Sequence, residues 1–155
     1  MKLRILAVGT KMPGWVEQGV CEYVKRMPRE MPVEFVEIAP GTRSKNSVTD
    51  KAIAQEGDRM LSKLREQDLV VTLEVTGRAW STETLSNRLG EWRQEGRDVA
   101  LMVGGPDGLD PRVSARAEQR WSLSALTLPH PLVRIVLAEQ LYRAWSLLAG
   151  HPYHR

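Results

Sequence analysis

The end of the chain concentrates side chains that can do chemistry. His-Pro-Tyr-His-Arg (151–155) combines two imidazoles, a phenol and a guanidinium. An aromatic-plus-arginine segment can stack on a nucleic-acid base and contact phosphate, although a terminus is otherwise expected to fray. His151 and His154 are potential metal ligands, but the sequence shows no third ligand beside them, and a zinc site needs at least three. We therefore predict no metal site.

A glycine-rich segment follows a strongly apolar stretch. Gly-Gly-Pro-Asp-Gly (104–108) comes directly after the apolar run of residues 98–104. Glycines allow a backbone to approach a ligand closely, whereas Pro-Asp-Gly is also a strong turn signal. The spacing leaves both interpretations open. It matches neither the dinucleotide nor the P-loop fingerprint, which argues against those two cofactor classes.

Small and hydroxyl-bearing residues alternate loosely with leucines in Trp121–Pro131. Such a segment, as a loop or strand end, can offer backbone polar groups to a flat, amphipathic ligand such as adenosine. A buried edge strand is the alternative.

Two further features have both a structural and a functional interpretation. Arg112, Arg116 and Arg120 recur at i, i+4 and i+8. On a helix they would form one basic stripe, either a solvated face or a track for phosphates. The single cysteine, Cys21, falls in the middle of a predicted helix, where a core position is the expectation. Neither a G-x-S-x-G nor an H-E-x-x-H motif is present.

Strand and helix patterns alternate along the chain. The apolar spacing predicts strands, in sequence order, at residues 2–8, 33–39, 68–75 (closed by Gly77) and 98–104. It predicts helices at 15–27, 50–64 and 82–95, the last capped by Ser81 or Thr82. The alternation indicates a mostly parallel α/β sheet, and the continuously apolar fourth strand indicates helices on both faces.

The last predicted helix is apolar nearly all round. It begins near Pro131, ends before Gly150, and carries apolar residues on most of its circumference from Leu132 to Leu148. A helix of this kind is buried on more than one side. In so short a chain the sheet can cover one face, and a second subunit would cover the other. We therefore expect a homodimer.

The bulk composition is that of an ordinary globular protein. The 155 residues are 42% hydrophobic and 26% charged, with a net charge of +3, so we expect one domain spanning residues 1–155. No apolar run approaches the length of a membrane span. One cysteine rules out an intramolecular disulfide and a cysteine-rich zinc site. We expect a cytoplasmic protein; the modest charge permits an anionic partner without demanding one.

Several of these motifs together resemble one family. The opening residues 2–13, the 104–108 loop, the run from Trp121 to Trp145 and the terminal 151–155 are similar to the SPOUT-class RNA methyltransferases, specifically those that methylate N3 of a pseudouridine in large-subunit rRNA. The resemblance covers essentially the whole chain. It implies an α/β fold with a C-terminal trefoil knot, S-adenosylmethionine bound bent within the knot, and a homodimer without a separate RNA-binding domain. The implied substrate is a pseudouridine of 23S rRNA, presented by the assembled ribosome.

The resemblance also assigns roles to residues. Cofactor positions are Leu73, Gly104, Gly105, Leu123, Ser124, Ala125, Leu126, Thr127 and Leu128. The imide N–H of pseudouridine is a poor nucleophile until its proton leaves, and a nearby cation or donor would stabilise the anion. Tyr153, His154 and Arg155 are the candidates for this catalytic role, with His130 a weaker one; which of them accepts the proton stays open. The family often has Glu where this chain has Asp107.

Two other classes of function compete. A non-catalytic ribosome-binding or assembly factor would lack affinity for the cofactor, and the intact glycine loop and tail argue against it. A nucleotide-dependent enzyme such as a small oxidoreductase would need a dinucleotide fingerprint, which the chain does not have.

Overall fold

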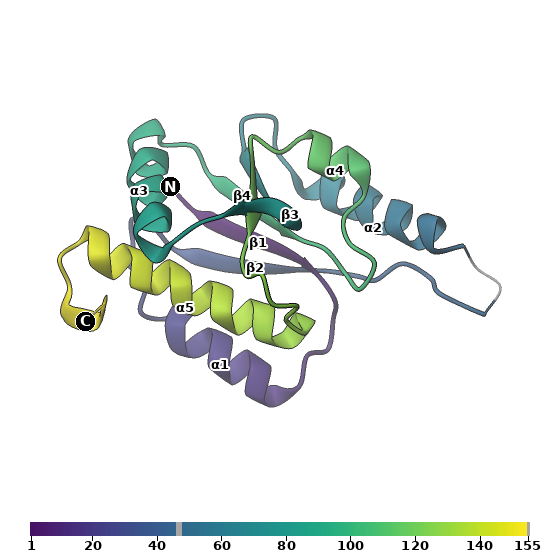
Figure 1. Ribbon diagram of the computed structural model, residues 1–155, viewed down its shortest axis with the longest axis horizontal. Coiled ribbons are helices and arrows are strands. Elements are labelled where there is room, and N and C mark those ends of the chain that lie inside the picture. Colours follow the sequence, from purple (N-terminus) through teal and green to yellow (C-terminus); the bar gives the residue numbers. More distant parts are fainter. Residues whose placement is uncertain (46–47, 155) are drawn as a thin grey trace.

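The computed structural model describes residues 1–45 and 48–154. Its elements, in chain order, are β1 Leu3–Val8, α1 Gly14–Val24, β2 Val33–Ile38, α2 Thr49–Lys63, β3 Leu69–Ala79, α3 Thr82–Glu95, β4 Val99–Val103, α4 Pro111–Ala115, β5 Gln119–Ser122, α5 His130–Leu148 and the 3₁₀ turn η1 Pro152–His154 (Figure 1). The predicted alternation of strands and helices is confirmed. The Ser81 cap of α3 is confirmed as well, because its hydroxyl accepts a hydrogen bond from the Thr84 amide.

The strands form a five-stranded sheet in the order β2-β1-β4-β3-β5. Every strand pair described is parallel. Their carboxyl ends, and the loops that follow, therefore meet at the same edge of the sheet. In open α/β sheets this edge is where ligands bind.

Helices cover both faces of the sheet, as predicted (Figure 1). On one face, the strands pack with residues of α3 and α5 such as Leu89, Trp92 and Leu141. On the other, they pack with residues of α2 and α4 such as Met60 and Val113. Each fully buried side chain of this size stabilises the fold by about 1.5–3 kcal/mol. The core is thus two apolar layers that hold the strand ends in a fixed register.

Helix α5 lies between α1 and α3 and contributes Leu137, Leu141 and Ala144 to the core. Other elements of the same chain therefore cover more of the α5 surface than the sequence suggested. Leu132 near its start nevertheless remains 40% exposed. Neither α5 nor any other helix within the described ranges is long and apolar enough to cross a membrane.

The prediction that Gly77 ends the third strand is wrong. β3 continues to Ala79, and its pairing with β5 shifts register between Leu73 and Arg78. A Cβ on Gly77 would lie 2.8 Å from backbone atoms of Arg120 and Trp121. The glycine thus serves close approach of the neighbouring strand, which is a different use from ending one.

The segment with Arg112, Arg116 and Arg120 is not one helix, so the condition for an arginine stripe is not met. Arg112 lies in the short helix α4, where it binds Asp110 and Asp58, but α4 ends before Arg116. Arg120 belongs to β5. The chain leaves the helix after one turn to pair with β3, so the three arginines share no helical face.

Cys21 is not a core residue, contrary to the prediction. It is exposed and lines an apolar groove with Val20, Val24 and Phe35. The buried residue of α1 is Val16, and a position five residues later lies about 140° round the helix. The rotation of α1 therefore turns Cys21 away from the sheet.

Candidate functional site

The predicted cofactor positions lie on or directly after three neighbouring strands: Leu73 lies inside β3 and not at its end, whereas the other two segments follow β4 and β5. Leu73 of β3 lies opposite both Val103 of β4 and Trp121 of β5. Val103 leads into the glycine loop, residues 104–108, and Trp121 leads through Ser122 into residues 123–128. Residues far apart in the sequence are therefore brought together because β3 is paired on both sides.

The glycine loop folds back on itself as a tight turn. The Gly108 amide donates to the Gly105 carbonyl at 3.1 Å, and Gly108 has a φ of +89°. A Cβ on Gly104 would lie 2.8 Å from the Gly108 carbonyl carbon. A Cβ on Gly105 would meet Val8 Cγ1 at 3.0 Å. The turn interpretation of this segment is confirmed, and its glycines are required by the packing of the loop itself; a cofactor role in addition stays a prediction.

The second segment, residues 123–128, is a loop, so the edge-strand alternative applies only to the β5 residues before it. The Ser124 hydroxyl accepts a hydrogen bond from the Leu126 amide at 2.9 Å. Ala125, Leu126 and Thr127 are exposed, and Leu126 is 76% exposed. The loop therefore offers polar backbone and an apolar side chain to whatever binds at this edge.

A cavity of about 390 Å³ opens beside this loop. It is lined by Trp80, Ser81, Thr82, Leu85, Trp121, Leu123, Ser124, Leu128, Val136 and Gln140. The rings of Trp80 and Trp121 stack with centroids 5.0 Å apart. The buried Trp121 Nε1 finds no hydrogen-bond partner among residues 1–45 and 48–154. Its size and its mixed lining, which combines tryptophan and leucine side chains with Ser81, Thr82 and Gln140, suit a small amphipathic ligand, although Leu73, Gly104 and Gly105 are not part of the lining.

The buried Arg134 links the start of α5 to the ends of β1 and β2. Arg134 donates to the Gly9 carbonyl at 2.8 Å and to the Glu37 carboxylate at 2.9 Å. Burial, and second the nearby Arg134 guanidinium, lower the pKa of His130 below its usual 6.5. His130 is thus neutral at pH 7. Sequence reasoning missed Arg134, whose signal was a charge inside an otherwise apolar helix start.

The tail is docked on the last turns of α5. The Tyr153 hydroxyl donates to Glu139 Oε2 at 3.0 Å, and its ring packs on Tyr142 with centroids 4.6 Å apart. Burial, with the hydrogen bond to Glu139, raises the pKa of Tyr153 to about 12. The expectation of a frayed end is wrong for Tyr153 and His154. Arg155, the third predicted catalytic residue, lies outside the described residues.

Within one chain, the tail and the predicted cofactor segments adjoin opposite ends of α5. The loop 123–128 precedes the start of α5 and the tail follows its end, and the two lie at opposite ends of the helix (Figure 1). The helix has 19 residues, and the Tyr153 hydroxyl reaches back along it only as far as Glu139. The structure therefore does not bring Tyr153 and His154 to the predicted cofactor positions. In the described part of the chain, no group of three or more potential metal-ligating side chains gathers either.

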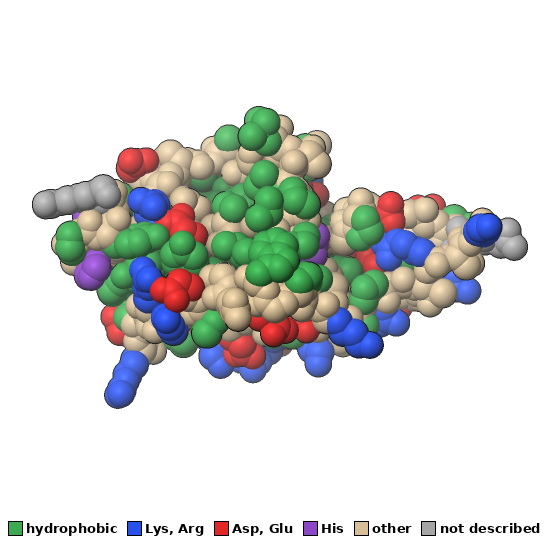
Figure 2. All heavy atoms as spheres, turned by 90° about the horizontal axis from the view of Figure 1, so that it is seen from below, with side chains coloured by type: hydrophobic (Ala, Val, Ile, Leu, Met, Phe, Trp, Pro, Cys, Tyr) green, Lys and Arg blue, Asp and Glu red, His purple; other side chains and the backbone are tan. Residues whose placement is uncertain are grey.

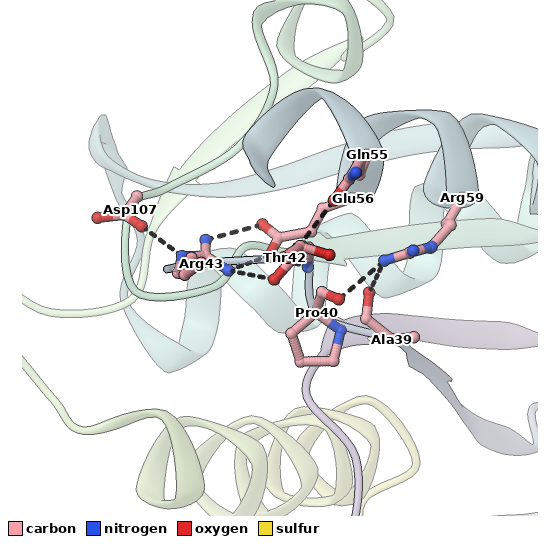
Figure 3. Close-up of polar contacts among 9 residues, drawn as sticks. Ala39, Pro40, Thr42, Arg43, Gln55, Glu56, Arg59 and Asp107 are labelled. Carbon is pink, nitrogen blue, oxygen red and sulfur yellow. Dashed lines mark hydrogen bonds and ion pairs between the residues drawn. The ribbon is translucent and has the colours of Figure 1, made fainter. Parts of the chain in front are cut away.

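Sequence patterns did not reveal an ion-pair cluster around the buried Glu56 carboxylate, beside the glycine loop (Figure 3). Arg43 donates to Glu56 Oε2 at 2.7 Å and to Asp107 Oδ2 at 2.8 Å. The Glu56 side chain is 3% exposed and also accepts from the Gly41 amide at 2.8 Å. The sequence showed a polar, basic loop before α2, but nothing in it indicated partners so distant along the chain.

Comparison with known proteins identifies the family. A family model described as "Predicted SPOUT methyltransferase" matches residues 1–154. The chain is 69% identical over 155 residues to the Ribosomal RNA large subunit methyltransferase H of Chromohalobacter salexigens, covering both chains completely. It is 60% identical to the protein of the same name from Hahella chejuensis, covering all of this chain and 99% of the relative.

Solved structures of low sequence identity share the fold. A probable methylase family protein from Haemophilus influenzae superposes with a TM-score of 0.58 at 12% identity, over 99% of this chain and 70% of the other. A putative methylase family protein from Neisseria gonorrhoeae gives 0.56 at 13% identity, over 90% and 81%. The trefoil knot expected from the resemblance stays a prediction. The family model matches residues 1–154, and the two relatives of the same name are 69% and 60% identical to this chain over 155 residues. These matches establish that the chain belongs to the SPOUT methyltransferase family.

Proposed function

We propose that the protein transfers a methyl group from S-adenosylmethionine to ring nitrogen 3 of a pseudouridine in 23S rRNA, acting on the assembled ribosome in the cytoplasm as a single-domain enzyme. The convergence of three predicted cofactor segments on the β4-β3-β5 edge is the observation that carries this proposal. The names of its full-length relatives, each a ribosomal RNA large subunit methyltransferase, support the class of substrate.

The residues at this edge fit the cofactor. The loop of exposed residues 125–127 can bind the polar edge of adenosine, and the neighbouring cavity offers the side chains of Trp80, Trp121 and Leu123 to its flat face. When bound, S-adenosylmethionine supplies an activated methyl group on a sulfonium. The protein then has to position donor and acceptor in line, which by itself provides a large part of the rate.

The tail supplies the groups that the acceptor needs. The imide nitrogen must lose its proton, and a neighbouring cation stabilises the resulting anion. Arg155 is the cation that we assign to this role, with His154 beside it. Because the pKa of Tyr153 is raised to about 12, its phenol is protonated at neutral pH and does not act as the base; its one proton is donated to Glu139.

The distance between tail and loops favours a homodimer. If two α5 helices pack side by side in antiparallel orientation, each tail lies near the cofactor segments of the other protomer. The face that carries α1 and α5 has hydrophobic side chains gathered at its centre (Figure 2). Its groove is lined by Met12, Val16, Glu17, Val20, Cys21, Val24, Phe35, Glu37 and Arg134. A monomer rarely leaves such an apolar surface uncovered.

The test of the cofactor site is Ala125→Arg. Ala125 is exposed, so the substitution should leave the fold intact while placing bulk and positive charge where the sulfonium donor binds. Calorimetry should show lost affinity for S-adenosylmethionine at an unchanged thermal midpoint. Gly105 is a poorer site for this test, because a Cβ there already meets Val8.

The activity assay is methyl transfer to ribosomes that lack the modification, with protein-free rRNA alongside. Wild-type protein should methylate the ribosomes and Ala125→Arg should not. Unchanged donor affinity in the variant would overturn the site. A wild-type protein that binds ribosomes but takes no donor would be the non-catalytic factor, and equal activity on free rRNA would remove the ribosome as the presenting scaffold.

A further inference from the structure

We propose that Arg43 is a positioning residue for donor binding: it fixes the tip of the glycine loop by tying it to a buried carboxylate on α2. This inference rests on the proposed function, because it assumes that the donor binds beside residues 104–108. It adds Arg43, a residue to which neither the family motifs nor the sequence patterns assigned a role.

The Arg43 guanidinium bridges two carboxylates from different parts of the chain. Its Nη1 and Nη2 donate to the two oxygens of Glu56, at 2.7 and 3.3 Å. Its Nε donates to Asp107 at 2.8 Å. Only a planar, forked cation can make this arrangement, because a lysine ammonium is a single point of charge. Charge-assisted hydrogen bonds of this kind are stronger than neutral ones.

The α2 side of this bridge is held by several hydrogen bonds besides those of Arg43. The amides of Gly41 and Thr42 donate to Glu56 and Gln55, each at 2.8 Å. Arg59 donates to the carbonyls of residues 39 and 40, at 2.8 and 2.9 Å (Figure 3). The loop before Arg43 is thus fastened to α2 at several points, and Arg43 reaches out from this fixed base.

The other side of the bridge is the tip of the glycine loop. Asp107 lies between Pro106 and Gly108, at the turn that follows β4. In the sheet, β1 separates β2 from β4, so the bridge spans the carboxyl end of β1. The Glu56 carboxylate also lies directly behind the loop, since its Oε1 is 3.5 Å from where a Cβ of Gly105 would be.

This bridge restrains a loop that has to present its backbone to a ligand. A loop held in the binding conformation loses less entropy when the ligand arrives. If the Arg43–Asp107 bond is cut, the fold is retained because the Asp107 side chain is 36% exposed, but the loop tip is freed. Donor affinity should therefore fall while the rate at saturating donor changes little.

The test is calorimetry with S-adenosylmethionine on Asp107→Asn, Arg43→Met and the double variant, alongside thermal midpoints. Each single change should weaken donor binding by roughly two- to thirty-fold, the range for residues that act through neighbours. The double variant should be no weaker than Arg43→Met, because both changes remove the same link. Asp107→Glu should retain most of the affinity, and Arg43→Lys only part. In methyl-transfer assays, KM for the donor should rise with kcat nearly unchanged.

Arg59→Ala is the matched control, because Arg59 holds the same loop on α2 without touching the glycine loop. Its donor affinity should stay at the wild-type value. Unchanged affinity in both Asp107→Asn and Arg43→Met overturns the inference, as does an equal loss in Arg59→Ala. If Ala125→Arg also binds the donor normally, the proposed donor site is wrong. If Ala125→Arg abolishes donor binding but Asp107→Asn and Arg43→Met do not weaken it, only the positioning role of Arg43 is wrong.

Discussion

His130 shows how one residue's surroundings set its charge. It sits at the first turn of α5, next to Arg134, which is held by Gly9 and Glu37. Burial and this arginine lower the pKa of His130, so the folded protein favours the neutral imidazole. That neutrality removes His130 from the cations available to stabilise an imide anion near pH 7.

The lowered pKa of His130 predicts a pH dependence of stability. Below about pH 6.5 the unfolded chain binds a proton on this ring more readily than the folded chain does. The free energy of unfolding should therefore fall as the pH drops from 6.5 through the lower, folded-state pKa. Thermal melts between pH 7.5 and 5 should show a steeper loss for wild type than for His130→Gln, with His151→Gln as control. Parallel curves for wild type and His130→Gln would contradict this.

Division of labour between tail and loops is a second prediction for single residues. Removing Tyr153–Arg155 should abolish methylation and leave the affinity for S-adenosylmethionine nearly intact, because a cation near a sulfonium gives no benefit. Arg155→Ala alone should lose much of the rate, and Arg155→Lys should recover only part of it. Methyl transfer to unmodified ribosomes and donor calorimetry measure the two effects. Full activity of the truncated enzyme would take the tail out of the mechanism.

Among the elements, the β3–β5 edge depends on Gly77. A Cβ there would lie 2.8 Å from the backbone of β5, so Gly77→Ala must push the strands apart or shift the register, at a cost of about 1–3 kcal/mol. Gly14→Ala is the control, since no atom lies within 4 Å of a Cβ at that position. Urea unfolding should show the loss only for Gly77→Ala. Equal midpoints for Gly77→Ala and wild type would mean that the edge relaxes freely.

The element order was predictable because hydrophobic period is a local property. The boundaries of α3 and β2 follow from residues within them, and Ser81 caps a helix with its own hydroxyl. Features that depend on a neighbouring strand were not predictable. In the sequence, Gly77 indicates the end of a strand; the close approach of β5 that requires this glycine is visible only in the structure. The order of strands in the sheet is likewise a long-range property, which local periodicity does not report.

The candidate site likewise has parts that could be predicted from the sequence and parts that could not. Leu73, Gly104 and the 123–128 loop were placed by the family motifs, and the parallel sheet explains why they meet. Arg43 and Glu56 were missed because their pairing with Asp107 spans two loops and a helix. Sequence patterns report which face of an element is buried; they do not report which loops touch.

At the scale of the whole molecule, the separation of tail and loops predicts complementation between protomers. One chain carrying Ala125→Arg and another lacking Tyr153–Arg155 should each be inactive as homodimers. Mixed dimers should regain activity, because one protomer supplies an intact cofactor site and the other an intact tail. Co-expression with two affinity tags isolates the mixed species for the ribosome assay. No recovery in the mixed dimer, with both variants folded, would place both parts of the site in one chain.

Because the Cys21 thiol is exposed, its rate of chemical labelling can measure whether the protein dimerises. The thiol lies in the apolar groove over α1, on the surface that a second protomer would cover. Its alkylation by a maleimide should slow as protein concentration rises, with a midpoint equal to the dimer dissociation constant. Adding urea at low concentration should restore fast labelling before the core unfolds. Labelling that is fast at every concentration would show that the groove stays open to solvent.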